Sequence, residues 1–226
     1  MLRPGLALLH LCDSLFPIGA FGYSDGLEAA TATGLVETPG DLQAWLDVCL
    51  DEVVGRMDGP AALLAWSAFD RQDWEALSEI DEEITAMRPS LATRRSSRAM
   101  GFRLITMWSV LHPDGRMEHL LDLAGLRRPG PALPIAFGCA CASAGVGMRD
   151  TGEAFAYTRL ASTASAALRL MRIGQTEAHV RLAETLERVP AVVDAMTLRA
   201  RPQSFAPAMD VSAMAQQYLH SRLFRS

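Results

Sequence analysis

Two pairs of side chains have the chemistry of metal ligands. Cys139 and Cys141 are separated by one residue, as are His10 and Cys12. Residues two positions apart on a helix point about 200° away from each other, so neither pair would chelate one ion well. Structural zinc sites use wider cysteine spacing and further ligands nearby. The alternative is that the cysteines are small apolar side chains of the core, and we expect no metal site and no cofactor.

The histidines offer a second candidate. His112 and His119 flank the segment His112-Pro113-Asp114-Gly115 and could converge on one ligand. The composition of that segment is equally typical of a simple turn. His179 and His220 fall on expected amphipathic helices, facing the surface or a partner.

Nucleophilic chemistry has one weak candidate. Ser24 lies in residues 22–26 (GYSDG), which superficially resemble a nucleophile elbow but lack the preceding strand. The alternative is a loop beside a helix start, with Asp25 as the cap and Glu28 three residues later. Lysine is absent, and all 21 basic residues are arginine. Lysine Schiff bases and phosphate-loop lysines are therefore excluded.

One group of arginines could act on a phosphoryl group. Arg98 lies three and four residues after Arg95 and Arg94, so the three share a helix face. An arginine offered to a GTPase can stabilise the charge that develops during phosphoryl transfer. The alternative is a solvated face that pairs with the acidic residues 81–83. With no assembled active site, the chain is expected not to be an enzyme.

The elements that must position these side chains are helices. Apolar residues recur at helical spacing along most of the 226 residues, and no window alternates as a strand would. Half of the residues are hydrophobic, which is ample for a core. The sequence predicts an all-α fold, a single compact domain of about ten helices spanning residues 1–226. The net charge of −5 argues against nucleic-acid binding.

Two internal segments carry further expectations. Residues 129–148 are uncharged and reach the length of a membrane span, but their prolines, glycines and alanines favour a buried helix that neighbours approach closely. Asp58-Gly59-Pro60 is expected to break a helix. No secretory leader is recognised at the start, so we expect a cytoplasmic protein with reduced thiols.

Both ends of the chain are unusually apolar. Residues 205–226 predict a helix from Asp210 with an apolar stripe of Val211, Met214 and Tyr218, followed by Arg222, Leu223, Phe224 and Arg225. Residues 13–28 form an apolar loop that includes Phe21 and Tyr23. Such a tail either packs on its own core or is held by a partner. Exposed apolar patches of this kind tend to be interfaces, so a dimer is expected.

These segments resemble the urease accessory protein F (UreF) family. The resemblance rests on SLFPIGAFGYSDGLE at residues 14–28, AALRLMRIGQTEAH at 166–179, and FAPAMDVSAM followed by SRLFRS at the end. It implies a non-enzymatic, dimeric all-α factor in nickel-urease maturation. Members of the family bind the accessory D protein (also called H) and with it recruit the accessory GTPase G, which delivers nickel to apo-urease.

The resemblance also implies which residues bind partners. The family's C-terminal segment, which orders against the D/H protein, matches Arg222, Leu223, Phe224 and Arg225, and we add Tyr218. The glycine-glutamine motif matches Gly174, with Gln175 and Thr176 as the contact residues. A basic residue linked to fidelity of activation matches Arg169, with Arg172 as the alternative, and the aromatic loop matches Phe21 and Tyr23. Ala20 stands where the family usually has glycine.

Three classes of function remain in competition. A scaffold explains the missing active site and the apolar ends. An all-α enzyme would need a cofactor pocket that the sequence does not reveal. A transcription regulator would need a basic recognition helix, which only residues 94–103 approach in this acidic protein.

Overall fold

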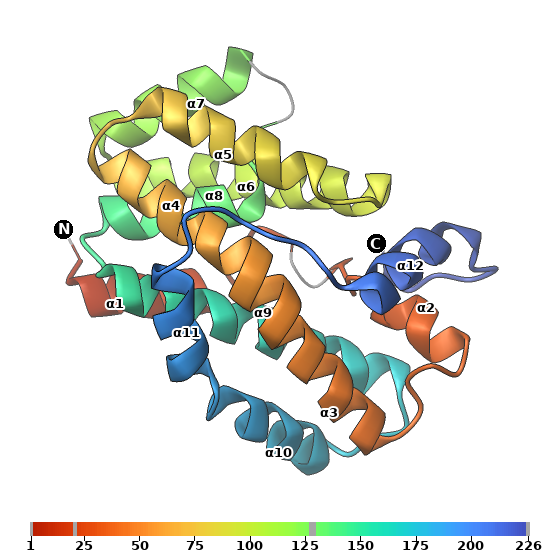
Figure 1. Cartoon of the computed structure of the whole chain (residues 1–226). Helices are drawn as coiled ribbons and strands as arrows, with labels where there is room; N and C mark the ends of the chain where they lie inside the picture. The colour runs from red at the N-terminus through yellow and green to blue at the C-terminus, as the bar shows by residue number, and fades with distance from the viewer. Residues whose placement is uncertain (1, 20–21, 127–129, 225–226) are drawn as a thin grey trace.

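Helices make up the regular structure of this chain (Figure 1). The computed structural model describes residues 2–19, 22–126 and 130–224, and no strand occurs in these ranges. The predicted all-α class, in a single compact domain, is confirmed. The first half contains α1 (Pro4–Cys12), α2 (Leu27–Ala32), α3 (Pro39–Val48), η2 (Cys49–Asp58), α4 (Gly59–Asp70), α5 (Trp74–Ala86) and α6 (Leu91–Leu111). The second half contains α7 (Gly115–Leu126), α8 (Leu133–Ser143), α9 (Met148–Leu170), α10 (Gln175–Leu186), α11 (Val189–Thr197), α12 (Pro207–Ala215) and η3 (Gln216–Tyr218).

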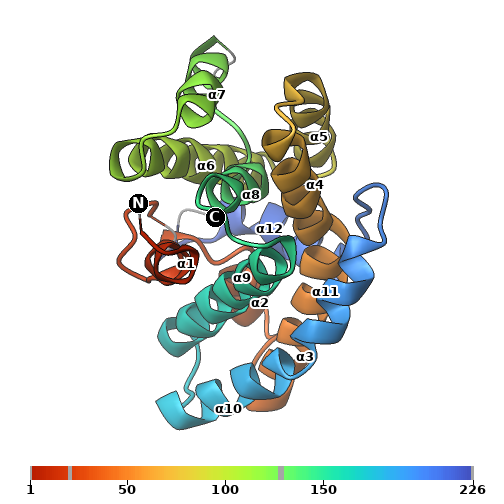
Figure 2. The same cartoon turned by 90° about the vertical axis from the view of Figure 1, so that its left-hand side faces the viewer.

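The helix at the centre of the molecule, α8, is built largely from small residues. All its residues from Leu133 to Ala142 are buried. It packs most extensively against α4 and α6, and also contacts α9, α7 and α5 (Figure 2). The expectation of a buried small-residue helix within 129–148 is confirmed. Within the described ranges, no helix combines the length and apolar character needed to cross a bilayer.

The close approach of α8 to α4 depends on a glycine. A Cβ atom added at Gly138 would lie 2.1 Å from the carbonyl oxygen of Ala62, which is far inside van der Waals contact. Only a residue without a side chain fits this position, because the obstacle is backbone that cannot rotate away.

The chain from α3 to α4 forms one continuous helical rod (orange in Figure 1), so the break expected at Asp58-Gly59-Pro60 does not occur. The middle of the rod, η2, is a π-helix. The backbone N–H of Gly59 donates to the carbonyl of Val54, five residues earlier, which is the π-helical pattern. Pro60, the second residue of α4, has no N–H to donate, and the carbonyl of Arg56, four residues earlier, accepts instead from the backbone N–H of Gln203 (2.8 Å).

The C-terminal segment packs on a helix from the early part of the chain. Helix α12 packs against α2 and α6, and Figure 1 shows the C-terminal segment beside α2. Helix α2 in turn contacts α9. Residues near 28, 169 and 224 are thereby brought to one region, although almost the whole chain separates the first from the last.

We expect the substitution Gly138→Ala to lower the free energy of unfolding by about 1–3 kcal/mol or more, because overpacking a core usually costs this much. Urea denaturation followed by circular dichroism measures the change. The matched control is Gly5→Ala in α1, where an added Cβ meets no described atom within 4 Å. A Gly138→Ala variant as stable as the Gly5→Ala variant would contradict the close approach of α8 and α4.

Candidate functional site: the seat of the C-terminal tail

A buried carboxylate on α2 holds the end of the chain. Glu28 is 5% exposed. Its Oε1 accepts a hydrogen bond from the backbone N–H of Leu223 (2.5 Å), and its Oε2 accepts from the N–H of Phe224 (3.1 Å) and from Nε2 of Gln216 (2.9 Å). A buried carboxylate is tolerated only when donors replace the lost water, and these three donors do so. We call Glu28, Gln216, Leu223, Phe224 and Arg169 the tail seat.

The start of α2 is shaped to receive the tail. Gly26 is the N-cap of α2, with φ +90°, and a Cβ there would lie 2.8 Å from the backbone nitrogen of Ala213 in α12. Ser24 donates from its hydroxyl to Oε1 of Gln216 (3.2 Å). The cap expected from Asp25 and Glu28 is therefore not formed. The Glu28 carboxylate instead accepts hydrogen bonds from the distant tail, and Asp25 pairs with Arg159 at 2.5 Å.

The side chain of Phe224 is buried where the tail meets α9. It is 3% exposed, and the guanidinium carbon of Arg169 lies 4.1 Å from the centre of its ring. An arginine over an aromatic face is attracted by the ring quadrupole. The three segments on which the family resemblance rests thus touch one another at the tail seat.

Neighbouring tail residues face the opposite way. Leu223 is 71% exposed and Tyr218 is 82% exposed. The expected stripe of Val211, Met214 and Tyr218 also faces solvent, whereas the buried residues of α12 and η3 are Met209, Ser212 and Gln216. The tail therefore packs on its own domain through one face and leaves an apolar face uncovered.

Two ion pairs lie beneath α12: Asp58–Arg88, which is buried, and Asp25–Arg159, which is partly buried. Asp58 of η2 and Arg88, which precedes α6, are 1% and 7% exposed and pair at 2.5 Å. Burial lowers the pKa of Arg159, but the nearby carboxylates of Asp25 and Asp58 outweigh it and hold that pKa above its ordinary value. Both pairs join segments far apart in sequence, so no local pattern could have revealed them.

Comparison with known proteins covers most of the chain. The UreF family model matches residues 36–186, two thirds of the chain. The chain belongs to the UreF family of urease accessory proteins. A urease accessory protein UreF from Methylibium petroleiphilum is 32% identical over 226 residues, covering 98% of this chain and 93% of that protein. One from an Arthrobacter species is 27% identical over 98% of this chain and 96% of its own length, and one from Lachnoclostridium phytofermentans is 32% identical over 58% of each.

The remaining residues that the UreF resemblance singled out are placed as follows. Tyr23 is buried, at 8% exposure, as part of the core. Gln175 and Thr176 are exposed in the first turn of α10, the helix that follows α9. Arg222 is exposed on the tail. Phe21 and Arg225 lie outside the described residues.

The candidates for metal or nucleophilic chemistry are dispersed in this UreF chain. Burial raises the pKa of the Cys12 thiol to about 11 and raises those of Cys139 and Cys141 further. His112 packs on Trp108 and His119 on Trp74, so the two histidines do not converge. Among the described residues, no group of three or more His, Cys, Asp or Glu side chains could hold a metal ion.

One arginine of the group on α6 forms an ion pair with the acidic run of α5. Arg98 donates to Oδ2 of Asp81 (3.2 Å) and to the hydroxyl of Thr85 (3.0 Å). The expectation of pairing between this helix face and residues 81–83 is confirmed at Arg98.

We expect Glu28→Ala to release the tail, because it leaves two backbone N–H groups and the Gln216 amide without their acceptor. Each unsatisfied buried donor costs about 1–3 kcal/mol. Hydrogen exchange followed by mass spectrometry should report faster exchange in residues 216–224 and little change in α8. The exposed Glu37→Ala serves as the control. Unchanged protection of the tail in Glu28→Ala would contradict the role of this carboxylate.

Proposed function

We propose that this UreF-family chain is a non-enzymatic scaffold for nickel-urease maturation. In this proposal it bridges the accessory D/H protein and the accessory GTPase G, and thereby modulates nickel insertion into apo-urease. It acts as a homodimer in the cytoplasm. Family membership supports the setting, and the arrangement of the tail supports the role as a binding protein.

The observation that carries the proposal is the division of the tail into a held face and a free face. Glu28 holds the tail backbone from inside, and Arg169, which is exposed, lies over the ring of Phe224. Leu223 and Tyr218, anchored by these contacts, present apolar surface to solvent. A preorganised apolar surface costs less entropy on binding than a free chain end would.

The residues divide into two roles under this proposal. Leu223, Tyr218 and Arg222 contact the D/H protein directly, since large apolar side chains and arginine are typical interface anchors. Phe224 contributes by fixing the tail, and a direct contact with a partner would require it to leave its buried position. Arg169 links the tail to the end of α9, close to the exposed Gln175 and Thr176 that follow it in sequence.

We expect Leu223→Asp to abolish capture of the D/H protein without unfolding the domain. The side chain is 71% exposed, so the substitution removes no internal packing. The measurement is a pull-down with purified D/H protein beside a thermal melt. The matched control is Leu198→Asp, at a position 87% exposed at the end of α11. Full binding by Leu223→Asp would refute the tail as the contact.

Deletion of residues 221–226 should behave differently from that point variant. It also removes Phe224, whose burial contributes about 1.5–3 kcal/mol. For a domain of this size each kcal/mol corresponds to about 2–4 °C in Tm. Loss of binding together with a lower Tm is therefore expected for the deletion, and loss of binding alone for Leu223→Asp.

We expect Arg169→Ala to change urease activity per bound nickel in a maturation assay, because it removes the group that packs on Phe224. The effect on stability should be about 0.5–2 kcal/mol, the range for cation–π contacts. Arg172→Ala, also exposed and three residues away, is the matched variant. If Arg172→Ala alters activity per nickel and Arg169→Ala does not, the fidelity role belongs to Arg172.

A further inference from the structure

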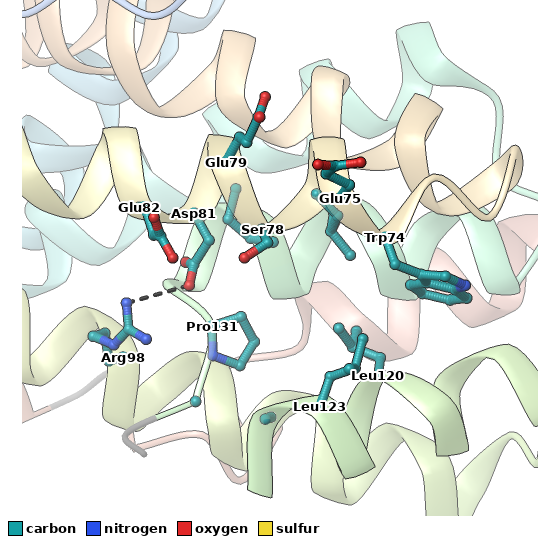
Figure 3. A pocket seen from close by; sticks show the side chains of 14 residues that line it. Trp74, Glu75, Ser78, Glu79, Asp81, Glu82, Arg98, Leu120, Leu123 and Pro131 are labelled. Carbon is teal, nitrogen blue, oxygen red and sulfur yellow. Dashed lines mark hydrogen bonds and ion pairs between the residues drawn. The ribbon is translucent and has the colours of Figure 1, made fainter. Parts of the chain in front are cut away.

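A second hollow lies far from the tail seat, between α5 and α7. It encloses about 450 Å³. Its floor is apolar, and the side chains that form it come from three helices and the segment before α8. They are Leu77, Leu120, Leu123, Ala124, Pro131 and Ile135. We call this hollow the α5–α7 groove (Figure 3).

The rim of the groove along α5 is acidic. Glu75, Glu79 and Glu82 line it at spacings of four and three residues, and all three are exposed. In Figure 3, α5, which carries Glu75 and Glu79, lies across the groove from Leu120 and Leu123, and the carboxylate of Glu79 points away from these two leucines. Within the described ranges, the carboxylates of Glu75 and Glu79 have no hydrogen bond or ion pair.

The positive charge at the groove is already engaged. Among the described residues that line the groove, Arg98 is the one cation, and it pairs with Asp81 at 3.2 Å. Asp81 also accepts from the backbone N–H of Ala132 at 2.7 Å. Arg98 and Asp81 therefore satisfy one another, and the groove presents the negative charge of Glu75 and Glu79 to whatever enters it.

We propose that the α5–α7 groove binds a basic amphipathic segment of a partner protein. Its aliphatic side chains enter the groove, and arginine or lysine side chains pair with Glu75 and Glu79. A neutral segment would gain only the apolar contact, and an acidic one would be repelled by the rim. The groove involves none of the tail seat residues, so it adds a second interaction surface to the chain.

The partner that supplies this segment is sought among the components of urease maturation, a choice that rests on the proposed function. The probes are overlapping 15-residue peptides that cover the D/H protein, the GTPase, the urease subunits and this chain itself. Each is titrated with the full-length protein by fluorescence anisotropy, at low and at moderate salt. Peptides with net positive charge and aliphatic residues, taken from another protein, should bind best, and salt should weaken them.

The substitutions that test the groove are Glu75→Gln with Glu79→Gln. We expect the double variant to bind the selected peptides at least fivefold more weakly. The matched control is Glu118→Gln with Glu187→Gln, which removes two exposed carboxylates outside the groove. A third variant, Arg127→Ala with Arg128→Ala, removes the basic residues that precede Gly130 in the sequence, and it should bind no worse than the parent.

Several results would overturn the proposal. These are the absence of any bound peptide at millimolar concentration, a preference for neutral or acidic peptides, and equal weakening by the control pair. Best binding by peptides of this chain would make the groove a contact between copies. Binding that appears only in Arg127→Ala with Arg128→Ala would mean that the chain's own arginines occupy the groove. Capture of the D/H protein through Leu223 is measured separately, so failure of the groove leaves the tail result interpretable.

Discussion

The close packing of α8 against its neighbours is the constraint on which the rest of the structure depends. A helix that is buried on all sides cannot carry long side chains without pushing its neighbours apart, and at Gly138 the carbonyl of Ala62 leaves no space even for a methyl group. The rod from α3 to α4 is therefore held at a fixed distance from α8. Because α6 and α9 also contact α8, the surfaces that receive the tail and line the α5–α7 groove are positioned by the same core.

The tail seat is the point at which the C-terminal segment is attached to this core. A carboxylate with two acceptor oxygens can hold two successive backbone N–H groups and a side-chain amide together, and Glu28 does so. The chain bends at Leu223 and Phe224, so both N–H groups face Glu28 while the Phe224 side chain is buried and the Leu223 side chain is exposed. One side chain anchors the tail inside, and the other remains outside. Under the proposed function, stability and recognition are assigned to adjacent residues.

The polar groups buried below α12 explain why this region forms only when distant segments meet. Asp58 and Arg88 are each nearly inaccessible to water, and either one alone would carry a large desolvation penalty. Their pairing, and that of Asp25 with Arg159, is available only in the assembled fold. The tail helix covers these pairs, so the order of the tail and the burial of the charges support each other.

Local patterns were sufficient to predict much of the fold. Thr38, Pro39 and Asp41 predict a helix start, and the structure has a complete capping box there. The all-α class and the buried small-residue helix followed equally from periodicity and composition, because these depend on neighbours within a few residues. The family was also accessible, since its motifs are contiguous segments.

The arrangement of the site was decided by tertiary structure. Glu28 has the spacing of a helix cap, but a stronger set of donors arrives from almost two hundred residues away. The stripe on the tail helix has the period of an inward face, yet the other face of that helix is buried, because it packs closely on Gly26 and is followed by Gln216, which donates to Glu28. Pro60 has the local signature of a break, but the rod continues through it, and the carbonyl of Arg56 accepts from the distant backbone N–H of Gln203. Periodicity shows that a helix has an apolar face, whereas the surface that faces it depends on contacts which the local sequence does not contain.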